Sequence, residues 1–147
     1  MEIVKFISFV LLMVVELVKG KAFVLSGLKV DGKYKSARDA IRDKSHEPII
    51  AVDRKGRKIV YVHGNPDGSV RIGKENRPVE NLLNYIPESG IWMLLSCFNG
   101  ARSDVSSQKI KIYRDRRTAT RYPIYILWLG PNTMVVSSSQ TIYDLGL

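Results

Sequence analysis

His63 and Cys97 are the two residues of this chain whose types best suit nucleophilic catalysis, and each ends an apolar run. His63 ends KIVYVH, and Cys97, the only cysteine among 147 residues, ends IWMLLSC. A thiol with an ordinary pKa of about 8.5 is mostly protonated at neutral pH, and a neighbouring imidazole takes its proton as the sulfur attacks. An imidazole also returns a proton to a leaving amine. The pair predicts nucleophilic attack on a carbonyl group.

Glycine follows the histidine, and this suggests where an oxyanion would bind. Gly64 has no side chain and so leaves room for a substrate carbonyl. A tetrahedral intermediate needs N–H donors directed at its oxygen. We expect the backbone N–H groups of Gly64 and Cys97 to supply them. Nothing in the sequence identifies the residues that bind the rest of a substrate.

Two predicted strands position the histidine and the cysteine. Residues 57–63 and 90–97 are apolar runs, and a turn and a predicted helix at 77–86 separate them. A strand, a helix and a second strand form a right-handed crossover that makes the strands parallel neighbours. Ligands bind beyond the C-terminal ends of such strands. The sequence therefore predicts His63 and Cys97 at one edge of a sheet, facing a common cleft.

The remaining pattern predicts a single three-layer α/β domain with a mainly parallel central sheet and antiparallel additions. A second helix is expected at 33–44, and Lys55-Gly56 forms a tight hairpin turn between two strands. Residues 90–97 and 123–129 are apolar throughout, as in strands buried on both faces. The other predicted strands are 23–30, 48–54, 69–72 and 133–139.

An apolar strand ending in His-Gly, then a helix, then an apolar strand ending in Ser-Cys resembles the caspase–legumain–gingipain group of cysteine peptidases. This group includes the self-processing domains of bacterial toxins and the CHAT domains. The matching segments are IVYVHG and WMLLSCFNG. The resemblance implies a caspase-like α/β sandwich and a His63/Cys97 dyad that hydrolyses a peptide bond in a polypeptide substrate, with self-processing as one form. The separation of His63 and Cys97 is short for this group.

The charge of the chain predicts an alternative function. The formal net charge is +9, which favours anionic partners. A degenerate caspase-like domain without catalysis would then be a basic binding module for an acidic protein, nucleic acid or a membrane surface. The simpler interpretation of the same stretch is a solvated loop or edge strand whose charges discourage aggregation. Residues 101–122 concentrate the basic side chains, which are Arg102, Lys109, Lys111, Arg114, Arg116, Arg117 and Arg121.

The N-terminal segment 1–22 has an apolar stretch of the length found in signal peptides. A removable secretory or anchoring segment would make the protein secreted or membrane-anchored, with the α/β domain spanning 23–147. The alternative is a buried helix of the fold itself, which would leave the protein cytoplasmic.

The scarcity of cysteine and histidine limits metal chemistry. One cysteine cannot form an intramolecular disulfide, and two histidines do not provide a multi-histidine zinc site. We therefore expect neither a metal nor a cofactor. A lone cysteine is also commonly a small buried apolar residue, and this remains the alternative for Cys97.

Overall fold

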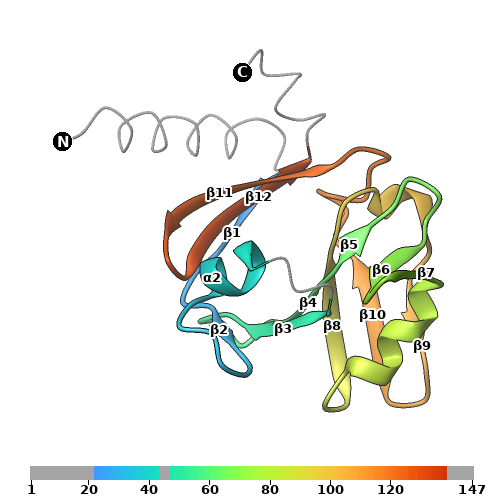
Figure 1. The fold of residues 1–147 in the computed structure, drawn as a ribbon, viewed down its shortest axis with the longest axis horizontal. Coiled ribbons are helices and arrows are strands. Elements are labelled where there is room, and N and C mark those ends of the chain that lie inside the picture. Colours follow the sequence, from blue (N-terminus) through green and yellow to red (C-terminus); the bar gives the residue numbers. More distant parts are fainter. Residues whose placement is uncertain (1–21, 44–46, 139–147) are drawn as a thin grey trace.

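The computed structural model describes residues 22–43 and 47–138, and these residues form a mixed α/β structure built mostly from strands (Figure 1). The strands belong to one six-stranded sheet and two three-stranded sheets. The predicted N-terminal segment lies outside the described residues, except that Ala22 already pairs with Ser137 at the start of the first strand.

The six-stranded sheet carries both strands that were predicted to position the site. Its order is β2-β3-β4-β8-β10-β9. β8 lies between β4 and β10 and is parallel to both, whereas the other neighbours are antiparallel. The predicted antiparallel additions therefore flank a parallel centre, but only two of the five neighbouring pairs are parallel, so a mainly parallel sheet is not confirmed. The strand bounds are β2 (Lys29–Val30), β3 (Ile49–Val52), β4 (Lys58–Tyr61), β8 (Gly90–Leu95), β10 (Ile110–Arg114) and β9 (Val105–Ser106).

The predicted hairpin between β3 and β4 is confirmed. Ile49 to Val52 pair antiparallel with Tyr61 to Lys58. The buried carboxylate of Asp53 accepts hydrogen bonds from the backbone N–H groups of Lys55 and Arg57 at 3.0 and 2.8 Å. Gly56 has φ +80°, a conformation that glycine adopts without steric cost.

A second sheet, of order β1-β12-β11, is antiparallel throughout. It contains β1 (Ala22–Leu25), β12 (Thr133–Ser138) and β11 (Ile124–Gly130). The predicted strand 23–30 divides into β1 and β2 in different sheets, because Gly27 turns the backbone with φ +61°. The prediction that 123–129 is buried on both faces is wrong. β11 is an edge strand, and Tyr125 and Leu129 are exposed.

A third sheet holds the predicted histidine. It consists of β5 (His63–Gly64), β6 (Val70–Ile72) and β7 (Glu75–Arg77), with β6 in the middle. The next segment, predicted as a helix at 77–86, is the 3₁₀-helix η1 (Val79–Tyr85), which begins after Pro78. A shorter 3₁₀-helix, η2 (Asn99–Ala101), follows β8.

The helix predicted at 33–44 is shorter in the structure. α2 (Ala37–Arg42) begins after Ser36, whose hydroxyl accepts a hydrogen bond from the backbone N–H of Asp39 at 3.1 Å. Such a cap satisfies one of the free N–H groups of the first turn. The helix buries Ala37 and Ala40.

Two hydrophobic cores cover the two faces of the six-stranded sheet. Successive side chains of a strand point to opposite faces, and Ile59 and Val60 of β4 belong to different cores. The first core joins this sheet to α2 and the β1-β12-β11 sheet. The second core joins it to β6 and η1. Burial on both faces explains why β4 and β8 are almost continuously apolar.

Candidate active site

His63 lies just beyond the end of β4 rather than within it. β4 ends at Tyr61, and His63 and Gly64 form β5, where they pair with Arg71 and Val70 of β6. The backbone N–H of Val62 still donates to the carbonyl of Leu95 at 3.2 Å, which extends the β4–β8 ladder by one residue. The strand therefore crosses from one sheet into another at the histidine.

Cys97 occupies the corresponding position after β8. Tyr61 of β4 is opposite Leu95 of β8 in the parallel ladder, so His63 and Cys97 each lie two residues beyond one matched pair. Both residues lie beyond the ends of β4 and β8, His63 in β5 and Cys97 in the turn after β8. The structure thus places the two predicted residues after neighbouring parallel strands, at the same end of the sheet.

Gly64 has a different role from the one that its lack of a side chain suggested. A β-carbon at this position would overlap the carbonyl oxygen of Cys97 and the hydroxyl of Ser96. It would also lie 2.7 Å from Nη1 of Arg102. The space beside the Gly64 α-carbon is therefore filled by the chain itself and not left for a substrate carbonyl. The backbone N–H groups of Gly64 and Cys97 stay predicted oxyanion donors.

The sulfur of Cys97 lies in a half-buried position with a backbone donor directed at it. The N–H of Ile124 is 3.4 Å from Sγ. The segment that leads to Ile124 runs along the loop after Cys97, because the N–H groups of Phe98 and Gly100 donate to the carbonyls of Tyr122 and Thr120 at 2.9 and 2.7 Å. The arginine-rich stretch is thus part of the wall beside the thiol.

Tyr61 contacts the histidine from inside the first core. Its ring and the imidazole of His63 are arranged edge to face, with centroids 6.0 Å apart. Burial raises the pKa of the Tyr61 phenol, and the nearby Cys97 contributes in the same direction. Tyr61 therefore stays neutral at physiological pH and acts as a packing surface for the imidazole.

Arg102 is the residue of this site that the sequence did not reveal. It was predicted to contact an acidic partner, but its side chain is buried, with 6% of the residue exposed. Burial lowers the pKa of its guanidinium, although the nearby Cys97 and Asp67 act against that shift. Six oxygen atoms at 2.8–3.2 Å surround the guanidinium, namely Ser96 Oγ, Asn99 Oδ1 and the carbonyls of Asn65, Gly68, Ser69 and Cys97. An arginine in a polar loop after a strand gives no sequence signal that separates this role from a surface charge.

The other basic side chains of residues 101–122 divide into two groups. Arg114 and Arg117 are half-buried and form ion pairs with Asp104 and Asp115 at 3.2 and 2.7 Å. The remaining four are exposed, and none of them forms an ion pair with the part of the chain that the structure describes. They are Lys109, Lys111, Arg116 and Arg121.

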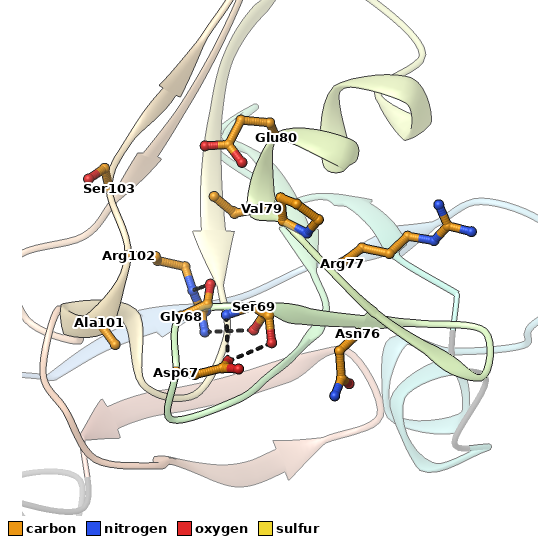
Figure 2. Close-up of a pocket in the computed structure, with 11 residues that line it drawn as sticks. Asp67, Gly68, Ser69, Asn76, Arg77, Val79, Glu80, Ala101, Arg102 and Ser103 are labelled. Carbon is orange, nitrogen blue, oxygen red and sulfur yellow. Dashed lines mark hydrogen bonds between the residues drawn. The ribbon is translucent and has the colours of Figure 1, made fainter.

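A pocket of about 460 Å³ lies on the other side of Arg102 (Figure 2). Val79, one of its lining residues, belongs to the second core. Neither His63 nor Cys97 lines it. On its rim, hydrogen bonds from the side chain and backbone of Ser69 hold the pKa of Asp67 below its usual value. This pocket is separate from the predicted dyad.

Within residues 22–43 and 47–138, no group of three or more histidine, cysteine or acidic side chains is arranged to hold a metal ion. In the same ranges no helix is long and apolar enough to cross a membrane. Comparison of the chain with protein-family models, curated proteins and solved structures gave no match.

Proposed function

We propose that this protein is a cysteine peptidase-like domain in which His63 and Cys97 form a catalytic dyad with a caspase-like arrangement. The observation that carries the proposal is the matched position of the two residues, two steps beyond the Tyr61–Leu95 pair of neighbouring parallel strands. The parallel centre of the six-stranded sheet and the half-buried, partly accessible thiol support it.

The reaction follows from the chemistry of the two groups. The imidazole of His63 takes the thiol proton as Sγ of Cys97 forms a bond to the carbonyl carbon of the peptide. The tetrahedral intermediate collapses, the C–N bond breaks, and the imidazolium gives its proton to the leaving amine. Water then attacks the thioester, His63 takes a proton from it, and breakage of the C–S bond releases the acid and restores the thiol. The N–H of Ile124, at 3.4 Å, gives the sulfur a donor while it carries negative charge.

The test is covalent capture of Cys97 by a peptidyl acyloxymethyl ketone, followed by mass spectrometry. His63→Ala should lower the labelling rate constant about 100-fold, in line with the contribution of a positioned acid–base group. Cys97→Ser should abolish labelling. Labelling in denaturant should be equal for the native and His63→Ala chains, because an unfolded thiol has no partner. Equal rates in the folded chains, with no cleavage of a peptide library covering all charge classes, would refute the proposal.

A second candidate function is supported by the exposed cations. Four basic side chains between residues 109 and 121 are exposed and lie outside the ion pairs of the described residues. This favours binding to a polyanionic partner, with an affinity that falls steeply with salt. Arg116→Glu/Arg121→Glu should abolish binding to an acidic peptide, a single-stranded oligonucleotide or anionic vesicles. The matched control is Lys33→Glu/Lys35→Glu, which reverses two exposed lysines elsewhere. Binding that is insensitive to salt would exclude this function.

A further inference from the structure

Arg102 joins the two loops that follow the proposed catalytic residues. The histidine loop (residues 65–69) follows His63-Gly64, and the cysteine loop (residues 96–102) contains Cys97. The guanidinium binds the carbonyls of Asn65, Gly68 and Ser69 in the first loop, at 3.1–3.2 Å. In the second loop its Nη1 binds Ser96 Oγ, the Cys97 carbonyl and Asn99 Oδ1, at 2.8–3.1 Å. Figure 2 shows Arg102 directed at Gly68 and Ser69.

These contacts use the full donor capacity of the side chain. Arginine has five N–H donors in a rigid planar fork, and six acceptors surround this one. Among the described residues no carboxylate forms an ion pair with Arg102, so its direct contacts are with oxygen dipoles of the two loops. A lysine has three donors on a flexible stem and cannot hold both loops in the same geometry.

The guanidinium also contacts the residue beside the histidine. Nη1 of Arg102 and the Cys97 carbonyl both pack against the α-carbon of Gly64. A displaced guanidinium would therefore disturb the packing of the Gly64 backbone against Cys97, and His63 immediately precedes Gly64. A misplacement of about 1 Å between reacting groups costs on the order of 100-fold in rate.

We propose that Arg102 is a positioning residue that sets the separation of His63 and Cys97 by clamping the histidine loop to the cysteine loop. This inference rests on the proposed dyad. Arg102 touches neither substrate nor the reacting atoms. It acts through the Cys97 carbonyl and the Gly64 backbone.

The experiment is a double-mutant cycle on the labelling rate of Cys97 with the same peptidyl ketone. Arg102→Lys should lower the rate at least tenfold, roughly, when His63 is present. In the His63→Ala background the same change should have almost no effect, because the geometry that it disturbs no longer matters. A role in folding alone would lower both rates by the same factor, so equal losses in the two backgrounds overturn the proposal. If His63→Ala alone leaves the rate unchanged, the dyad fails instead.

Two further variants keep the test decisive if Arg102→Lys folds poorly. Ser96→Ala removes one of three acceptors of Nη1 and should give a smaller loss that again depends on His63. A loss independent of His63 contradicts the clamp. The control is Arg57→Lys, since Arg57 likewise donates to a side-chain oxygen and a backbone carbonyl, those of Asp53 and Val24, but lies just before β4 begins. It should change the free energy of unfolding without changing the labelling rate of the folded chain.

Discussion

The α-carbon of Gly64 packs directly against the carbonyl oxygen of Cys97, so the segments after β4 and β8 touch through their backbones. Gly64→Ala forces a methyl group into that oxygen and the Ser96 hydroxyl. We expect the free energy of unfolding to fall by about 1–3 kcal/mol, as overpacking does. Urea denaturation followed by circular dichroism measures this. The labelling rate of Cys97 should fall as well, because the dyad separation changes.

Gly130→Ala is the matched control for Gly64→Ala. A β-carbon at Gly130 meets nothing within 4 Å, and its φ is not positive. We expect its free energy of unfolding and its labelling rate to match those of the native chain. If the two alanine variants are equally stable, the close contact at Gly64 is not present in solution.

Asp53 should be essential to the β3–β4 hairpin. Its carboxylate is buried and accepts hydrogen bonds from the Lys55 and Arg57 backbones and from Arg57 Nε, the last at 2.6 Å. Asp53→Ala should lower the free energy of unfolding by about 2–4 kcal/mol, because buried donors lose their acceptor. Thermal and urea unfolding test this, with the more exposed Asp104→Ala as a milder comparison. Equal losses would show that the hairpin does not depend on the Asp53 carboxylate.

Trp92 and Ile91 are adjacent in β8 but differ in burial, so they test where along this strand the core begins. Trp92 is 1% exposed, packs in the second core and donates its indole N–H to the Glu88 carbonyl at 3.2 Å, whereas Ile91 is 64% exposed. Trp92→Ala should cost about 3–5 kcal/mol of unfolding free energy. Ile91→Ala should change it by no more than about 0.5 kcal/mol. A large effect at Ile91 would mean that a partner or another part of the chain covers it.

The ion pair between Asp115 and Arg117 should make stability depend on pH. Burial acts to raise the pKa of Asp115, but hydrogen bonds and charge from Arg117 outweigh it, and the net pKa lies below its usual value. Since the unfolded pKa is about 3.9, the pair stabilises the fold above pH 4 or so and that contribution is lost as the pH falls further. Arg117→Met keeps an apolar contact with Phe23, whose ring centroid lies 4.0 Å from the guanidinium carbon.

With Arg117→Met, we expect the free energy of unfolding at pH 7 to fall by about 1 kcal/mol. The further loss between pH 7 and pH 3 should become smaller, because the pKa of Asp115 is no longer lowered. Urea unfolding at both pH values and an NMR titration of the Asp115 carboxyl measure these effects. Arg77→Met, which removes a more exposed pair with Glu75, is the control and should change little. An unchanged Asp115 titration would contradict the assigned cause.

The local pattern of the sequence was sufficient to predict several elements and the parallel pairing of β4 with β8. Apolar runs predicted β4 and β8, and Lys55-Gly56 predicted the hairpin between β3 and β4. Pro78 marked the start of η1. Where the pattern failed, the position of a strand in its sheet was determined by contacts between distant segments. The run 123–129 has the composition of a buried strand, yet β11 lies at the edge of its sheet.

The sequence by itself determined that an imidazole and the single thiol follow two apolar strands, because strand periodicity and strand ends are local properties. Only the tertiary structure decided that Gly64 packs against the Cys97 carbonyl and that Arg102 is buried between the two loops. The physical reason is that a guanidinium leaves water only where acceptors from distant segments converge on it. No arrangement of neighbouring residues along the chain reports such a convergence.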